Sequence, residues 1–80
     1  MDKKEVEEKV KEILAKELNI KKENITPEKR LIEDLGMDSF KAIEIIFEIE
    51  DSFGKRIKDS EIKNIKTVRD IIQRLEDSRS

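Results

Sequence analysis

Residues 33–40 read Glu-Asp-Leu-Gly-Met-Asp-Ser-Phe, and this stretch connects a loop to the most apolar helical segment of the chain. Gly36 interrupts the pattern that precedes it, whereas Asp38 and Ser39 are residue types that favour helix starts. The sequence turns strongly helical from Phe40, so we expect Ser39 to lie where the loop becomes a helix. The unpaired N–H groups and the dipole at a helix start favour an anion, so a phosphate ester on the Ser39 hydroxyl would rest in an anion site.

An Asp-Ser pair before a helix is by itself usually only a cap, so the sequence around it decides the interpretation. The run Leu31–Phe40, followed by Glu44 and later by Phe53, resembles an acyl carrier protein. The resemblance covers nearly the whole chain. Its further positions are Glu23, Asn24, Ile25, Thr26, Ile57, Asp59, Glu61, Ile65, Thr67, Val68 and Ile72.

The resemblance implies that Ser39 is a covalent attachment site, framed by Asp38 and Gly36. In that family the serine of an Asp-Ser-Leu motif bears a 4′-phosphopantetheine arm. A phosphopantetheinyl transferase would move this cofactor from coenzyme A to Ser39. The thiol of the arm would then carry acyl groups as thioesters to acyl-transferring and synthase enzymes of fatty-acid, lipid or related synthesis. The chain itself would be a carrier with no catalytic residue, not an enzyme.

Composition excludes several other kinds of site. Eighty residues suffice for a single domain, which we expect to span residues 1–80. The chain has no cysteine, so it has no disulfide, thiol nucleophile or zinc–thiolate site. It has no histidine, so a Ser-His-Asp triad is excluded. The acidic residues also lack the spacing of a calcium-binding loop. It has neither a membrane-spanning apolar run nor a signal-peptide pattern, which favours a cytoplasmic location. We also expect the protein to be a monomer.

Acidic residues gather in the middle of the chain. Residues 1–32 carry a net charge of +1, residues 33–53 carry −6 and residues 54–80 carry +3, within a total of −2. The central segment should therefore bind partners with basic patches, and nucleic acid is not expected to bind there. The predicted docking face consists of Glu44, Glu48 and Asp51, with Asp38 beside the arm and Lys41 on the same exposed arc.

Hydrophobic periodicity predicts an all-α fold, a small four-helix bundle with three longer helices, a short third helix and a long first loop. The expected helices cover residues 3–18, 40–52, 59–64 and 67 onward, and the long connection covers residues 19–35. The apolar residues of the second helix span roughly 220° of the helical wheel, so that helix should touch several neighbours. Glu50 falls within this arc, and we expect its carboxylate to escape at an edge.

Individual residues predict where the elements begin and end. Asn19 and Gly54 should end the first and second helices, and Asp59 or Ser60 should cap the third. Thr67, with Asp70 three residues later, predicts a capping box for the last helix. One short helical turn is expected at residues 26–28, and a frayed tail at residues 76–80.

We further expect an acyl chain to enter between the second helix and the short third helix. The wheel and the resemblance together predict that Ile46, Phe53, Ile57, Ile62 and Ile65 line this pocket. The same residues would serve equally well in a closed core. The third segment has few apolar residues, so it is the part most able to move.

Two other hypotheses for the function remain open. The chain could be an aminoacyl or peptidyl carrier domain, or a helical interaction module that carries nothing. Three positions depart from the family pattern. Phe40 replaces the leucine after the serine, Lys41 stands where an acid is frequent, and Lys58 stands where a proline is frequent. These lysines, with Lys55 and Arg56, favour a specialised carrier over a strongly acidic housekeeping one.

Overall fold

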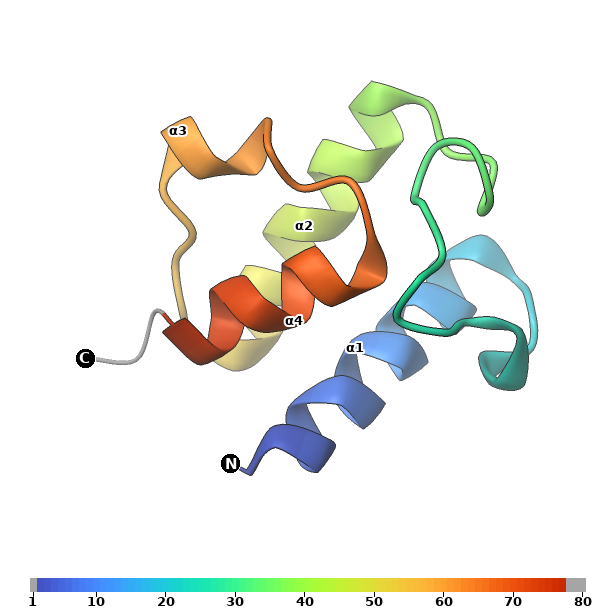
Figure 1. Cartoon of the computed structure of the whole chain (residues 1–80), viewed down its shortest axis with the longest axis horizontal. Helices are drawn as coiled ribbons and strands as arrows, with labels where there is room; N and C mark the ends of the chain where they lie inside the picture. The colour runs from blue at the N-terminus through green and yellow to red at the C-terminus, as the bar shows by residue number, and fades with distance from the viewer. Residues whose placement is uncertain (1, 78–80) are drawn as a thin grey trace.

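The computed structural model describes residues 2–77, and within this range the chain forms helices and no β-strand (Figure 1). The elements are α1 (Lys3–Leu18), the 3₁₀ helix η1 (Lys22–Asn24), α2 (Ser39–Phe53), α3 (Asp59–Ile62) and α4 (Val68–Asp77). The predicted all-α bundle with a long first loop and a short third helix is therefore confirmed. α4 continues to Asp77, and the rest of the predicted frayed tail, residues 78–80, lies outside the described residues.

Local signals set the bounds of α1. Asp2 and Glu5 form a capping box, in which the N–H of Glu5 donates to Asp2 Oδ1 at 2.9 Å and the N–H of Asp2 donates to Glu5 Oε1 at 3.2 Å. Asn19 ends the helix in the left-handed conformation with φ of 57°, as its sequence position predicts. The face of α1 that points into the bundle buries Val6, Val10 and Leu14.

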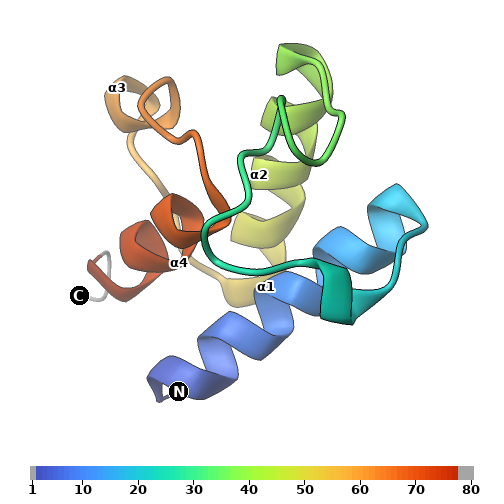
Figure 2. The same ribbon diagram turned by 45° about the vertical axis from the view of Figure 1, so that its right-hand side comes forward.

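α1 packs against both α2 and α4, and this contact forms the centre of the core. α3 lies away from α1, on the other side of α2 and α4 (Figures 1 and 2). α4 turns a continuous apolar stripe towards α1 and α2. Its buried residues are Val68, Ile71, Ile72 and Leu75, and those of α2 are Ala42, Ile45, Ile46, Ile49 and Glu50.

Backbone hydrogen bonds hold the long first loop against the start of α4. The N–H of Leu31 donates to Lys66 O at 2.9 Å, and the N–H of Val68 donates to Lys29 O at 3.0 Å. Residues 26–28 form only a hydrogen-bonded turn, and the helical turn of this loop lies upstream as η1. Pro27 lacks an N–H, and its carbonyl accepts from the N–H of Arg69 at 2.9 Å instead of continuing a helix.

Glu50 is buried, so the expectation that its carboxylate escapes at an edge is wrong. Its side chain is 9% exposed, and Oε2 accepts the N–H of Ile57. Gly54 ends α2 with φ of 65° and turns the chain back, which brings Ile57 over the Glu50 carboxylate. A helical wheel describes one helix alone and cannot show this return of the chain.

The segment around α3 is short and lightly packed. α3 ends at Ile62, and its N-cap residue is Lys58, which makes no capping hydrogen bond, so the predicted caps Asp59 and Ser60 are wrong. The capping box of α4 is confirmed, because the N–H of Thr67 donates to Asp70 Oδ2 at 3.1 Å and the N–H of Asp70 donates to Thr67 Oγ1 at 3.2 Å. The chain is thus fixed firmly at the start of α4 and only weakly along α3.

Candidate functional site

Ser39 is the first residue of α2, and it is exposed to solvent. Asp38 caps the helix by accepting the N–H of Lys41 at 2.7 Å. Within residues 2–77, the N–H groups of Ser39 and Phe40 have no hydrogen-bond partner. These two donors and the helix dipole act beside the Ser39 hydroxyl, so the position suits a phosphodiester.

The loop before Ser39 has a defined conformation. Gly36 has φ of +77°, a left-handed conformation that favours glycine, although the space around it is open. Met37 follows with its side chain buried, and its N–H donates to Leu31 O at 3.1 Å. Asp34 accepts the N–H of Arg30 at 2.8 Å, and this bond, aided by the Arg30 guanidinium, lowers the pKa of Asp34. The loop therefore presents Ser39 from an anchored backbone.

A groove of about 870 Å³ runs beside Ser39 between α2, the α3 segment and the end of the first loop. Its floor is mostly aliphatic and aromatic, and charged side chains stand at its margin. The lining residues are Leu31, Ile32, Glu33, Ser39, Ala42, Ile43, Ile46, Phe47, Asp59, Ile62, Lys63, Ile65 and Lys66.

Three of the five residues predicted to line an acyl pocket, Ile46, Ile62 and Ile65, lie in this groove. Phe53 and Ile57 are not among its lining residues. Phe53 lies at the other end of α2, where Lys9 Nζ is 5.4 Å from its ring centroid, and Ile57 is buried in the core. The apolar stripe of α2 continues past the groove to that end, which is why the wheel grouped Phe53 with Ile46.

Phe40, Ile43 and Phe47 form an exposed apolar face of α2 that sequence reasoning assigned to packing. Their exposed fractions are 73%, 40% and 49%. The signal for this face was the width of the apolar arc, which at roughly 220° is about twice that of an ordinary core-facing stripe. Ile43 and Phe47 border the groove, whereas Phe40 lies outside it.

The predicted docking residues Glu44, Glu48 and Asp51 are exposed on α2 and border a hollow of about 460 Å³ that also includes Glu17 of α1. The carboxyl of Glu17 raises the pKa of Glu48 by hydrogen bonding to its protonated form and by charge repulsion. Lys41 Nζ lies 4.0 Å from Glu17 Oε1, so this lysine leans towards α1.

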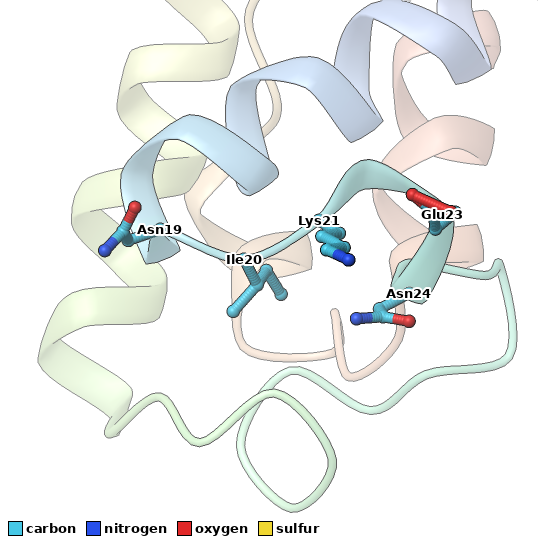
Figure 3. A pocket seen from close by; sticks show the side chains of 5 residues that line it. All are labelled: Asn19, Ile20, Lys21, Glu23 and Asn24. Atoms are coloured by element: carbon cyan, nitrogen blue, oxygen red, sulfur yellow. The ribbon is translucent and has the colours of Figure 1, made fainter.

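Another hollow, of about 620 Å³, lies in the loop after α1 and is lined by Asn19, Ile20, Lys21, Glu23 and Asn24 (Figure 3). All five residues come from one short segment, so no second element closes the hollow. It contains none of the predicted site residues. The described part of the chain has no cluster of three or more His, Cys, Asp or Glu residues arranged to hold a metal ion.

No helix within residues 2–77 is both long enough and apolar enough to cross a membrane.

Comparison with known proteins agrees with this geometry. A family profile described as the phosphopantetheine attachment site matches residues 8–75. Over 73 residues the chain is 41% identical to an acyl carrier protein of Saccharopolyspora erythraea, covering 91% of this chain and 77% of that protein. Over 72 residues it is 40% identical to an acyl carrier protein of Thermosynechococcus vestitus, covering 90% and 89%.

The fold also matches a solved structure. An acyl carrier protein from Enterococcus faecalis superimposes with a TM-score of 0.81 and 29% identity, covering 99% of this chain and all of that one. The matched family profile spans the first loop, Ser39, α2 and α3, together with most of α1 and α4. On these findings the chain belongs to the acyl carrier protein family, whose members carry a phosphopantetheine prosthetic group.

Proposed function

We propose that Ser39 bears the phosphopantetheine arm and that the chain carries acyl groups on it as thioesters. The observation that supports this most directly is the position of Ser39, exposed at the first turn of α2 beside two free N–H groups and an apolar groove. The Ser39 hydroxyl would form a phosphodiester as the pyrophosphate bond of coenzyme A breaks. Adenosine 3′,5′-bisphosphate leaves, and a base of the transferase takes the hydroxyl proton.

The carrier chain would bind, orient and present its cargo without doing chemistry of its own. It contains no histidine and no cysteine, so the usual general base and thiol nucleophile are absent. The acyl-transfer reactions therefore belong to partner enzymes. An aminoacyl or peptidyl cargo would use the same attachment, so the test of attachment precedes any test of cargo.

Intact mass tests the attachment. The apo protein is incubated with coenzyme A, Mg²⁺ and a broad-specificity phosphopantetheinyl transferase, and the mass should rise by one arm. Ser39→Ala should abolish the rise, while Ser52→Ala, which changes an exposed serine at the other end of α2, should keep it. A wild-type chain that gains no mass would contradict the carrier function and favour a helical interaction module.

We propose Glu44, Glu48 and Asp51, with Asp38 beside the arm, as the face that partner enzymes bind. Reversing Glu44 and Glu48 to lysine should slow loading by the transferase, more at low salt than at high salt, because exposed charges act mainly on encounter. Glu23→Lys, in η1 and outside the hollow that this face borders, is the control of equal charge change for either reversal made singly. Equal loading rates for all variants at low salt would place recognition elsewhere.

We propose that the acyl chain enters the groove along Ile46, Ile62 and Ile65. Each CH₂ group that leaves water contributes about 0.8 kcal/mol, so longer acyl chains should raise the melting temperature. The gain should level off once the chain fills the groove, of which Ile62 is one lining residue. Melting temperatures that do not depend on chain length would place the cargo outside the groove.

We further propose that this carrier serves a specialised pathway and not housekeeping fatty-acid synthesis. Lys41 sits on the acidic face of α2, and Lys55, Arg56 and Lys58 follow its end, where they would alter the choice of partner. The test measures acyl transfer from the loaded protein by housekeeping fatty-acid enzymes. The same measurement on Lys41→Asp shows whether this lysine limits the transfer. Transfer equal to that from those enzymes' own carrier would contradict the specialised pathway.

A further inference from the structure

Two lysines stand on the same groove as Ser39. Lys63 is the C-cap residue of α3, Lys66 lies just before α4, and both line the groove as exposed residues. Within residues 2–77 neither ammonium group has an ion-pair partner. Among the described residues that line this groove, no other side chain is cationic.

The backbone that carries these lysines is anchored on both sides. The N–H of Lys66 donates to Asp70 Oδ2 at 2.9 Å, and its carbonyl accepts from Leu31 at 2.9 Å. Between the two lysines, the N–H of Ile65 donates to Ile62 O at 3.0 Å, and the Ile65 side chain is buried. The ammonium groups therefore extend from backbone that hydrogen bonds tie to the start of α4 and to the end of α3, although α3 itself is lightly packed.

Most acidic side chains near the groove already have an ion-pair or hydrogen-bond partner. Glu33 Oε2 lies 3.3 Å from Arg30 Nη1, and the carboxylates of Asp34 and Asp38 accept backbone N–H groups. Two acids, Glu33 and Asp59, are among the described residues that line the groove, and within residues 2–77 Asp59 has no such partner. An anion attached at Ser39 would thus meet two uncommitted ammonium groups at the margin of an apolar floor.

We propose that Lys63 and Lys66 form an anion subsite for a group carried on Ser39. This rests on the proposed function, since the anion must be attached there. Two sources share the chemistry: the phosphodiester of the arm, and a carboxylate at the far end of the acyl cargo. With the phosphodiester, the lysines position the arm across the groove. With the carboxylate, they make the carrier selective for acyl groups that end in an acid.

The subsite also explains how a group with a charged end could be held along an apolar groove. An apolar floor favours a methyl-ended chain, because a carboxylate there would lose its hydration. Two ammonium groups at the margin let the charged end remain partly hydrated and paired while the methylene groups pack on the floor. Without these cations the carboxylate would lose this pairing, so the groove should hold that cargo less tightly.

The test compares a groove variant with a control of equal charge change. The groove variant is Lys63→Gln with Lys66→Gln. The control is Arg56→Gln with Lys58→Gln, two exposed residues outside the groove at the opposite end of α3. Each protein is loaded by the transferase with coenzyme A, with its octanoyl thioester, or with the eight-carbon thioester that ends in a carboxylate. Intact mass confirms loading in every case.

The melting-temperature change on loading and the amide NMR shifts of residues 62–66 are measured at low and at high salt. If the phosphodiester is the anion, the groove variant loses most of the change for all three forms, and the control does not. If the cargo carboxylate is the anion, only the carboxylate-ended form loses it. Both effects should shrink at high salt, since the Debye length falls from about 10 Å at 0.1 M to about 3 Å at 1 M.

Equal changes in the groove variant, the control and the wild type for every form would overturn the subsite. That result leaves the carrier function standing, because the mass measurement has already shown the arm in place. Failure to load the wild-type chain would instead overturn the proposed function, and with it the premise of the subsite.

Discussion

The contact between α1 and α4 and the segment around α3 differ sharply in how they are held. α1 and α4 bury side chains completely against each other, including Val10, Leu14 and Leu75 at 0% exposure. α3 has only four residues and buries none of them, and its side-chain tie to α4 is the pair between Glu61 Oε1 and Arg74 Nε at 3.1 Å. The fold therefore depends on the core between α1 and α4, while the α3 wall of the groove beside Ser39 is held by fewer contacts and should open more easily.

The largest loss of stability should come from a substitution in the core between α1 and α4. Leu14→Ala should cost about 2–5 kcal/mol, because it removes a fully buried side chain and leaves a cavity. Ile62→Ala in the half-buried α3 should cost about 1 kcal/mol or less. Urea unfolding measures both free energies. Similar losses at the two positions would mean that α3 belongs to the scaffold.

Glu50 joins the two regions, and its substitution should have the next largest effect. Glu50→Ala leaves the buried N–H of Ile57 without its acceptor, which should cost about 1–3 kcal/mol of unfolding free energy. Glu50→Gln keeps a carbonyl oxygen at the same position, so it should cost less. Thermal unfolding of the two variants gives the order. Equal losses would show that the charge, not the hydrogen bond, holds the start of the α3 segment.

Breaking the pair between Glu61 and Arg74 should loosen α3 with little effect on global stability. Both side chains are partly exposed, 42% and 26%, so the pair contributes about 0–1 kcal/mol. Arg74→Gln should speed hydrogen exchange of the amides of α3 while those of α1 keep their protection. The charge-swapped double variant, Glu61→Arg with Arg74→Glu, should restore slow exchange. Unchanged hydrogen exchange of the α3 amides in Arg74→Gln would show that other contacts hold α3 in place.

The smallest effect concerns the hollow between α1 and α2. Glu17 raises the pKa of Glu48 above its ordinary value of 4.5, so the protonated form is favoured in the folded state. This contribution to stability is present below the ordinary pKa and is lost as pH rises through the raised one. Glu48→Gln should therefore raise the melting temperature slightly at pH 7 and should leave it unchanged in acid. Melting curves across pH give the comparison, with Glu44→Gln as control.

Sequence alone determined the elements whose signals are local. The bounds of α1, the glycine stop of α2 and the capping box of α4 depend on residues within one or two turns of each other, so pattern and cap chemistry suffice. The place of Ser39 at the first turn of α2 follows from the same kind of signal in residues 33–40. The family resemblance rested on this stretch as well, and the profile match bears it out.

Only the tertiary structure decided which faces meet. The burial of Glu50 depends on Ile57, which returns to it around Gly54. The groove includes Phe47 but not Phe53, although both belong to the apolar arc of one helix. The placement of Lys63 and Lys66 on the same groove as Ser39 joins positions more than twenty residues apart. A helical period fixes directions within one helix, whereas these relations depend on the packing angles between helices and on the path of the loops, and local sequence does not encode either.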